Sequence, residues 1–327
     1  MEQPVATSPA TEDPVLAVCC QGERLVSVHA FETGEPIGGI PVGGHPVHAH
    51  AVDGRIFVAT MDERTLTVVE PDGAVERLRL GVLGPSHFAF AAGTLFVTCT
   101  AGDVVAAIDP AGPRLVDRIG VGAEPHELAA HGDRVFVGSR RDGVITAIDA
   151  EKLSRLGDVD VGGNARIEGV GLDGTGRLGY AVDRRGERLV GFSPDEMRVT
   201  GTAPIGRDAY DLTITEDAVY VPARGSGTVT AAGLDLEDGH EHTGFTSPVE
   251  VLPWHDEEWV VDRGRARLES LAGRTVDTPA GAIHAMGTEE GVVLAHYDDD
   301  AVSLVHPHDG IVWKTETGAH PLGLLVV

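Results

Sequence analysis

The feature that most constrains the fold is an internal repeat of about forty residues. Three segments align on a proline: VGGHPVHAHAVDGRIFVAT, LGPSHFAFAAGTLFVTC and VGAEPHELAAHGDRVFVGS. The prolines, at 46, 85 and 125, are 39 and 40 residues apart, and an aromatic residue follows each of them 11 positions later, at Phe57, Phe96 and Phe136. Each copy continues with a turn, a short apolar run that ends in an acid, and a fourth segment. Four short strands in a unit of this length predict a β-propeller blade.

Four weaker copies continue the same frame, and the chain ends on an eighth start, GAHPLGLLVV, which contains only a first strand. The N-terminal segments PVLAVCCQ, RLVSVHAF and PIGGIPVG can supply the missing strands. We therefore expect an all-β fold, a β-propeller of eight four-stranded blades over residues 14–327. Its last blade would be closed by both termini, which hides the sheet edges. Seven blades are the alternative, because the sixth copy spans only 34 residues, from 248 to 282.

The N-terminus and the cysteines indicate where such a protein works. Residues 1–13 lack the basic and apolar regions of a signal peptide, so we expect a short disordered tail. No apolar run approaches the ~20 residues of a membrane span. Cys19 and Cys20 are adjacent in a predicted strand and point to opposite faces, and Cys99 is the only other cysteine. Three thiols without a pairing pattern favour a reducing, cytoplasmic location.

The charge balance narrows the possible partners. The chain has 51 acidic residues against 25 basic ones, a net charge of -26, and lysine occurs only at 152 and 314. Such an acidic surface is typical of proteins adapted to high salt, where charge repulsion is screened. We expect neither nucleic acid nor an anionic membrane as a partner, because both would be repelled.

One copy of the repeat also resembles a known family. The stretch VGAEPHELAAHGDRVFVGSRRDGVITAIDAEKL is similar to the YVTN propeller repeats, which include lactonase-like propellers. That repeat runs Gly-x-x-Pro-His-x-hydrophobic, then Tyr-Val-Thr-Asn, then a strand ending in Ile-Asp. Residues 122–153 match it well and 42–110 nearly so, with FVAT, FVTC, FVGS and YVPA in place of Tyr-Val-Thr-Asn. The resemblance covers nearly the whole chain and implies the propeller fold. It does not select a function, because propellers of this kind include binding proteins, enzymes and scaffolds.

The repeat places polar residues at one position of every first strand. The first strand of a blade is innermost, and side chains alternate along it. We expect the first residue after each start to face into the blades; these are Val47, Ser86, His126, Ile167, Tyr210, Val249, Ile283 and Leu322. We expect the second residue to face the axis; these are His48, His87, Glu127, Glu168, Asp211, Glu250, His284 and Gly323. The ring therefore holds three imidazoles and four carboxylates.

A ring of this composition predicts a metal site. Four converging carboxylates repel one another and must be protonated, solvated or neutralised by a cation. Imidazole with carboxylate suits Zn, Mn, Fe or Cu better than Ca. We expect a divalent metal ion near His48, His87 and His284, with His50 one step deeper and with Gly323 leaving space beside them. The alternative is a wide, solvated channel that binds nothing specific. His240 and His242 form a weaker local candidate.

Arginines concentrate in the loops on the same face of the predicted ring. We expect eight of them, together with Tyr210, to bind substrate: Arg140, Arg141, Arg166, Arg184, Arg185, Arg207, Arg224 and Arg263. Arginine clusters favour carboxylate or phosphate ligands. The alternative is that these side chains pair with neighbouring acids in exposed turns, where each pair contributes little.

These features together favour a metal-dependent enzyme that acts on a small anionic molecule at the channel mouth. The metal would polarise a carbonyl or activate water. A carboxylate such as Glu127 or Glu168 would act as general base, and Asp211 and Glu250 are further candidate catalytic residues. Lactone hydrolysis or a lyase reaction fits the family resemblance. One alternative is a non-catalytic metal carrier, since the chain resembles the eight-bladed zinc chaperones of bacterial zinc uptake in blade count and axial histidines. Another is a protein-interaction scaffold.

Overall fold

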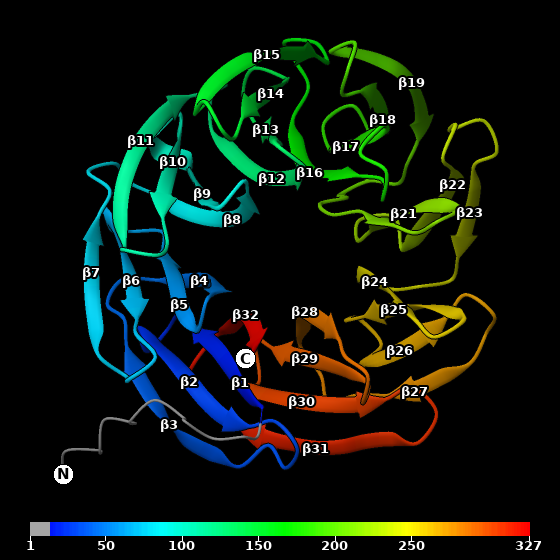
Figure 1. The fold of residues 1–327 in the computed structure, drawn as a ribbon. Coiled ribbons are helices and arrows are strands. Elements are labelled where there is room, and N and C mark those ends of the chain that lie inside the picture. Colours follow the sequence, from blue (N-terminus) through cyan, green and yellow to red (C-terminus); the bar gives the residue numbers. More distant parts are fainter. Residues whose placement is uncertain (1–13) are drawn as a thin grey trace.

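Eight antiparallel sheets of four strands each make up the fold of residues 14–327, the part of the chain that this computed structural model describes. The sheets are the blades of a ring around a central channel (Figure 1). The expected eight-bladed all-β propeller is thus confirmed, and the seven-bladed alternative is wrong. The tail expected at residues 1–13 lies outside the described residues. Within the described part, no helix has the length and apolar character needed to cross a membrane.

The blades are named A to H in the order in which the chain enters them. Blade A contains β1 (Val15–Cys20), β2 (Leu25–Ala30), β3 (Pro36–Pro41) and β32 (Pro321–Val326). Blade B contains β4 (Pro46–Val52), β5 (Arg55–Thr60), β6 (Thr65–Val69) and β7 (Val75–Arg79). Blade C contains β8 (Pro85–Ala91), β9 (Thr94–Cys99), β10 (Val104–Asp109) and β11 (Arg114–Gly120), with a short 3-10 turn, η1 (Thr100–Gly102), after β9. Blade D contains β12 (Pro125–His131), β13 (Arg134–Ser139), β14 (Val144–Asp149) and β15 (Ser154–Asp160).

The remaining four blades follow the same order. Blade E contains β16 (Ile167–Leu172), β17 (Gly179–Asp183), β18 (Arg188–Ser193) and β19 (Arg198–Pro204). Blade F contains β20 (Thr213–Ile214), β21 (Ala218–Ala223), β22 (Thr228–Gly233) and β23 (His240–Thr243). Blade G contains β24 (Pro248–Trp254), β25 (Glu257–Asp262), β26 (Arg267–Ser270) and β27 (Thr275–Asp277). Blade H contains β28 (Ala282–Gly287), β29 (Val292–His296), β30 (Ala301–His306) and β31 (Gly310–Glu316).

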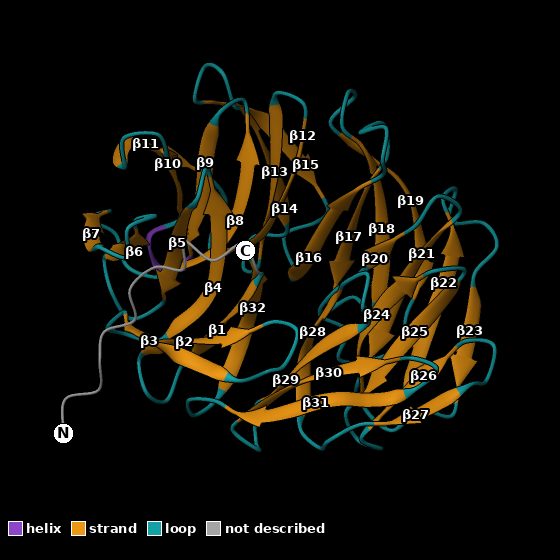
Figure 2. Ribbon diagram, turned by 60° about the horizontal axis from the view of Figure 1, so that its bottom comes forward, coloured by secondary structure: helices purple, strands orange, loops and turns teal. Residues whose placement is uncertain are grey.

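Both ends of the described chain close blade A. The C-terminal strand β32 pairs antiparallel with β1, with Leu16 opposite Val326 and Cys20 opposite Pro321. In Figures 1 and 2, β32 lies beside β1, between β1 and the channel. This pairing gives blade A its innermost strand and closes the ring with strands from both ends of the described chain.

The core lies between neighbouring blades, because each sheet uses both faces for packing. On β5, Phe57 packs with Leu95 and Val97 of blade C, whereas the next residue, Val58, packs with Ala17 of blade A. Successive strand residues point to opposite faces, so alternation along a strand serves the two neighbouring blades. The aromatic residue expected in the second strand is almost fully buried in five blades (Phe57, Phe96, Phe136, Tyr180 and Trp259), while Tyr220 is half-buried.

Short hairpins connect the strands and fix their register. Asp53 and Gly54 join β4 to β5 with φ of 49° and 77°, and Ala92 and Gly93 join β8 to β9 with φ of 47° and 76°. Two consecutive positive φ angles are the requirement of the tight turns whose twist matches that of the flanking strands. These turns define the face of the ring opposite to the loops that carry the arginines.

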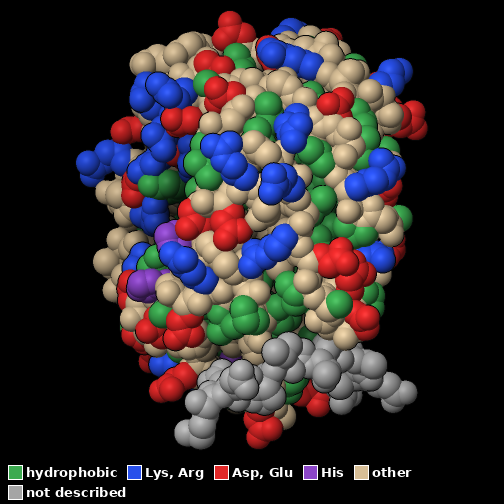
Figure 3. Space-filling model, turned by 90° about the vertical axis from the view of Figure 1, so that its left-hand side faces the viewer, with side chains coloured by type: hydrophobic (Ala, Val, Ile, Leu, Met, Phe, Trp, Pro, Cys, Tyr) green, Lys and Arg blue, Asp and Glu red, His purple; other side chains and the backbone are tan. Residues whose placement is uncertain are grey.

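The outer surface mixes charges of both signs. Figure 3 views the molecule from the side of β7 and β11, and basic and acidic side chains are interspersed there. Exposed ion pairs of the outer strands include Arg77 with Glu63 and Arg114 with Asp109. Exposed pairs of this kind contribute little to stability, so the fold depends mainly on the packing between blades.

Candidate functional site

All eight inner strands depart from regular pairing at the residues that begin the channel wall. In six blades the register shifts between the first strand residue and the residue two or three positions later, for example between Pro46 and His48 in blade B. In blade F, an isolated bridge at Ala209 precedes β20, and in blade A the pairing of β32 with β1 is irregular. A bulge of this kind re-aims side chains away from the sheet faces. It is the bulge, rather than simple alternation, that turns these side chains toward the channel.

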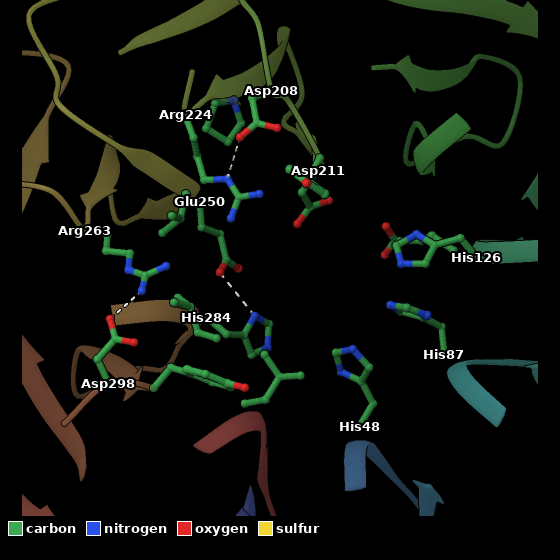
Figure 4. A pocket seen from close by; sticks show the side chains of 17 residues that line it. His48, His87, His126, Asp208, Asp211, Arg224, Glu250, Arg263, His284 and Asp298 are labelled. Carbon is green, nitrogen blue, oxygen red and sulfur yellow. Dashed lines mark hydrogen bonds and ion pairs between the residues drawn. The ribbon is translucent and has the colours of Figure 1, made fainter. Parts of the chain in front are cut away.

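The channel contains a chamber of about 420 Å³. Its lining combines four imidazoles, five carboxylates, two guanidinium groups and several apolar side chains. Figure 4 shows His48, His87 and His126 on one side and Arg224, Glu250 and Arg263 on the other. The lining residues are His48, His87, His126, Glu127, Asp208, Tyr210, Asp211, Pro222, Arg224, Val249, Glu250, Arg263, Ile283, His284, Tyr297, Asp298 and Leu322.

The expectation that the first residue after each start faces into the blades is wrong for five of the eight positions. Three of them, Val47, Ser86 and Ile167, are buried as expected. The other five line the chamber: His126, Tyr210, Val249, Ile283 and Leu322. The bulges explain the difference, because both residues at the irregularity leave the regular ladder. His126 therefore joins the channel wall although its position had been assigned to the blade interior.

Four imidazoles form a continuous row from blade H to blade D, which we call the imidazole wall. Ring centroids are 6.0 Å apart for His284 and His48, 4.5 Å for His48 and His87, and 4.3 Å for His87 and His126. Blade A contributes no side chain between His284 and His48, because residue 323 is a glycine. A Cβ at this position would lie 2.4 Å from the carbonyl oxygen of Val47, so the close approach of blade B requires glycine here. The backbone of blade B thus occupies the space expected at Gly323.

The second nitrogen of two of these rings is anchored. His126 Nδ1, when it carries the proton, donates a hydrogen bond of 2.8 Å to the backbone carbonyl oxygen of Glu168. His284 Nδ1 lies 3.3 Å from Glu250 Oε2. Both contacts leave Nε2 as the free ring nitrogen. Such an anchor is typical of histidines that bind metals through their other nitrogen. His87 Nδ1 is buried and has no hydrogen-bond partner among the described residues.

Burial keeps most of the imidazole wall neutral. Burial and the neighbouring imidazoles hold the pKa of His48 and His87 well below the usual range. Burial and the charge of Arg140 lower the pKa of His126 to about 3. Burial also opposes protonation of His284, but the Glu250 carboxylate outweighs it and raises the pKa of His284. Neutral imidazoles carry the lone pairs that metal ions and proton donors require.

Three carboxylates face the imidazole wall from blades D, F and G; they are Glu127, Asp211 and Glu250. Burial and the charges of Asp211 and Glu250 raise the pKa of Glu127 well above its usual range. Burial and the charge of Glu250 raise the pKa of Asp211 to about 6. Glu250 accepts a hydrogen bond of 2.8 Å from the backbone N–H of Ala285. The chamber thus holds carboxylates with raised pKa values together with a row of mostly neutral imidazoles.

Glu168, which we expected among the channel carboxylates, lies behind the chamber instead. Its side chain is fully buried. Its two oxygens lie 2.6 Å from Arg140 Nε, 2.6 Å from Arg166 Nε and 3.4 Å from a terminal nitrogen of Arg184. Both oxygens of this carboxylate are engaged by guanidinium groups, and its side chain does not line the chamber. Glu168 is the hub of an ion-pair network, and a general base is better sought at Asp211.

An arginine recurs at one structural position of four consecutive blades. The first residue after the second strand donates its backbone N–H to the incoming loop of its own blade. In blades D, E, F and G this residue is Arg140, Arg184, Arg224 and Arg263. In blades H, A, B and C the equivalent residues are Tyr297, Gln21, Met61 and Thr100. Each of these four blades therefore carries an arginine at this loop position, and blades D, F and G also place an acid in the channel.

Only two of the eight arginines expected to bind substrate line the chamber. Arg224 and Arg263 do so, and they lie near Asp208 and Asp298 (Figure 4). Arg140, Arg166 and Arg184 contact Glu168. Arg141 pairs with Glu124, Arg185 donates to Asn164, and Arg207 donates to the carbonyl of Gly225. Tyr210 lines the chamber between two guanidinium groups, at 3.9 Å from Arg184 and 4.0 Å from Arg224.

The remaining candidate, His50, lies away from the chamber. Its ring is half-buried, and its centroid is 6.0 Å from that of Phe88, against which it stacks. Within residues 14–327, no group of three or more His, Cys, Asp or Glu side chains is already arranged to hold a metal ion. Imidazole nitrogens are suitable ligands for a metal ion of borderline softness such as Zn. A coordination shell would require the rings of the imidazole wall to turn toward a common point.

No protein-family model matches the chain, and no curated protein matches it in sequence. Solved structures share its fold. The dihydro-heme d1 dehydrogenase NirN in complex with DHE superposes with a TM-score of 0.78 at 13% identity, over 99% of this chain and 77% of that one. Apo AztD from Citrobacter koseri has a TM-score of 0.71 at 12% identity, over 96% and 98%. A candidate 6-phosphogluconolactonase from Bacteroides fragilis has a TM-score of 0.64 at 11% identity, over 99% and 100%. At such identities the likeness concerns the fold alone.

Proposed function

We propose that this protein is an enzyme whose channel binds a divalent transition metal ion at the imidazole wall and acts on a small anionic molecule. The observation that carries the proposal is the row of four imidazoles in the chamber, of which His48, His87 and His126 are kept neutral by burial, together with an arc of carboxylates. Soft or borderline metals prefer imidazole, and a cation relieves the repulsion among the acids. A lactonase-like hydrolysis or a lyase reaction suits the resemblance to YVTN repeats.

The donors of the proposed metal site are His48, His87 and His284. The orphaned Nδ1 of His87 and the carboxylate contact of His284 support this assignment. Because the Glu250 carboxylate raises the pKa of His284, a metal ion at that ring competes with its protonation. A bound divalent metal would supply Lewis-acid polarisation of a substrate oxygen or a more acidic bound water.

The other residues of the chamber would handle the substrate and its protons. Asp211, with a pKa of about 6, is suited to accept a proton near neutral pH. Arg224 and Arg263 stand at the mouth, where they can hold an anionic group. The apolar side chains of Val249, Ile283 and Leu322 restrict the room for water around a bound molecule.

The test is metal binding followed by turnover. Protein freed of metal by chelation is titrated with Zn, Mn, Fe and Cu by calorimetry, in parallel with the His48→Ala and His87→Ala variants. We expect one of these metals to bind with one equivalent, and each variant to lose affinity by roughly 100-fold or more, since even outer-shell changes at metal sites cost 10–100-fold. His131→Ala is the matched control, because that ring is exposed at the end of β12.

Two outcomes would change the proposal. Equally weak binding of all four metals by the native protein and by His48→Ala would leave the chamber as a solvated channel. Tight binding without turnover of small lactones or hydroxy acids, and without any effect of Asp211→Asn, would identify a metal carrier rather than an enzyme.

A further inference from the structure

The two arginines of the chamber lie beside Asp208 and Asp298 and leave the deeper carboxylates Asp211 and Glu250 without an arginine partner among the described residues. Arg224 and Arg263 line the chamber at the mouth of blades F and G, and Asp211 and Glu250 line it in the same two blades. In the described part of the chain, no ion pair joins either arginine to either of these carboxylates. One cavity of about 420 Å³ thus holds guanidinium groups, each beside one aspartate, and a separate pair of carboxylates that no described arginine neutralises.

Arg224 has donors to spare. Its Nε is buried and has no hydrogen-bond partner among the described residues, and the closest carboxylate oxygen, on Asp208, is 3.6 Å away. The guanidinium stacks on Tyr210 at 4.0 Å, which fixes its plane. An unpaired buried donor is costly unless a ligand satisfies it, and a guanidinium fork matches a carboxylate.

Among the described residues, Asp211 is a carboxylate without a basic partner, as Arg224 has a donor without an acceptor. Its side chain accepts a hydrogen bond of 2.7 Å from its neighbour's backbone N–H, at Leu212, and no described basic side chain forms an ion pair with it. Glu250 has a single charged partner, His284, at 3.3 Å. A compact cation between Asp211 and Glu250 would offset their mutual repulsion. A primary ammonium group fits this role, because it is a point charge with three donors.

We propose that the chamber binds a small zwitterion of the amino acid type, with its carboxylate on Arg224 and Arg263 and its ammonium between Asp211 and Glu250. The proposal rests on the proposed function in one respect, that the chamber is where the substrate is held, and it refines the expected anion to a molecule that also carries an amine. The ring of Tyr297 and the side chains of Val249 and Ile283 line the space for its carbon skeleton.

The ammonium and the metal ion would occupy neighbouring parts of the chamber. The ammonium would sit between Asp211 and Glu250, away from His48 and His87, whereas the third proposed metal donor, His284, contacts Glu250 at 3.3 Å and borders both sites (Figure 4). Zwitterion binding is therefore measured on chelator-treated protein. A failure of metal binding then leaves the zwitterion result intact, and the reverse holds as well.

The experiment is a calorimetric series at constant ionic strength. The probes are the unbranched ω-amino acids from glycine to 6-aminohexanoate, with butyrate and propylamine as ligands that carry only one of the two charges. We expect one member of the series to bind at least about tenfold more tightly than either single-charge ligand, a difference of about 1.4 kcal/mol. Arg224→Gln should abolish this advantage over propylamine, and Asp211→Asn should abolish it over butyrate.

Matched controls come from the outer surface. Arg114→Gln and Asp117→Asn remove charges of the same kinds from exposed positions of β11, and they should leave every affinity unchanged. Each variant is also checked by circular dichroism for the native fold. The proposal is overturned if propylamine binds as tightly as every amino acid of the series, if no member binds, or if Arg224→Gln and Arg114→Gln behave alike.

Discussion

Glu168 offers the sharpest test of how the charged half of the ring is held together. Its fully buried carboxylate receives short contacts of 2.6 Å from Arg140 and Arg166 and a longer one of 3.4 Å from Arg184. Glu168→Gln keeps the shape and removes the charge. Each charged hydrogen bond is worth about 1.5–3 kcal/mol, so the two short ones together are worth about 3–6 kcal/mol.

The arginines decide where in that range the loss should fall. Breaking a buried ion pair costs about 3–5 kcal/mol when the remaining charge is stranded. Here the arginine side chains keep 19% to 35% of their surface exposed, so water can take over part of the lost interaction. We therefore expect Glu168→Gln to lower the free energy of unfolding by about 3 kcal/mol, the lower end of that range.

Chemical denaturation monitored by tryptophan fluorescence measures this loss. The matched control is Glu124→Gln, whose exposed pair with Arg141 spans 3.5 Å and should be worth less than about 1 kcal/mol. The Glu168 effect should also persist at molar KCl, because buried pairs are screened less than exposed ones. The reasoning is refuted if the two variants lose the same stability, or if salt abolishes the difference between them.

Three further predictions concern the whole fold. Phe96→Ala should lower the free energy of unfolding by about 3–5 kcal/mol, since its ring is fully buried, whereas Phe90→Ala at a 43% exposed position should cost far less; denaturant titration compares them. Rising KCl should raise the melting temperature, because the net charge of -26 repels itself at low salt; a flat or falling trend contradicts this. Burial lowers the pKa of His296 to about 4 from an unfolded value near 6.5. Its stabilising contribution is present above about pH 6.5 and is lost as the pH falls toward 4, so His296→Gln should flatten that part of a pH–stability curve.

The sequence predicted the fold because each blade repeats the same local signals. The spacing of Pro46, Pro85 and Pro125 defines the unit, and the lone first strand at the C-terminus indicates the closure with the N-terminal strands. Both signals are local in the chain and need no knowledge of the channel. That is why the blade count and the pairing of β32 with β1 followed from the repeat alone.

The chamber was only partly predictable, because strand alternation is an incomplete guide at a bulge. His48, His87 and His284 line it as expected, but His126 also does so, and Glu168 does not. The position of Glu168 depends on Arg166, two residues before it, and on Arg140 and Arg184 from two other loops, which a pattern along one strand cannot reveal. A comparison of equivalent loop residues across blades would have indicated the arc of arginines, since the backbone position is the same in each blade.

The central claim is that the imidazole wall binds a metal ion, and X-ray absorption at the edge of the bound metal tests it most directly. The protein is loaded with whichever of Zn, Mn, Fe or Cu binds most tightly, and the native protein is compared with His48→Ala and with His131→Ala. We predict at least two imidazole nitrogens in the first coordination shell, at about 2.0–2.1 Å if the metal is zinc. One of them should be lost in His48→Ala and retained in His131→Ala. A shell of oxygen ligands alone, identical in all three proteins, would contradict the account.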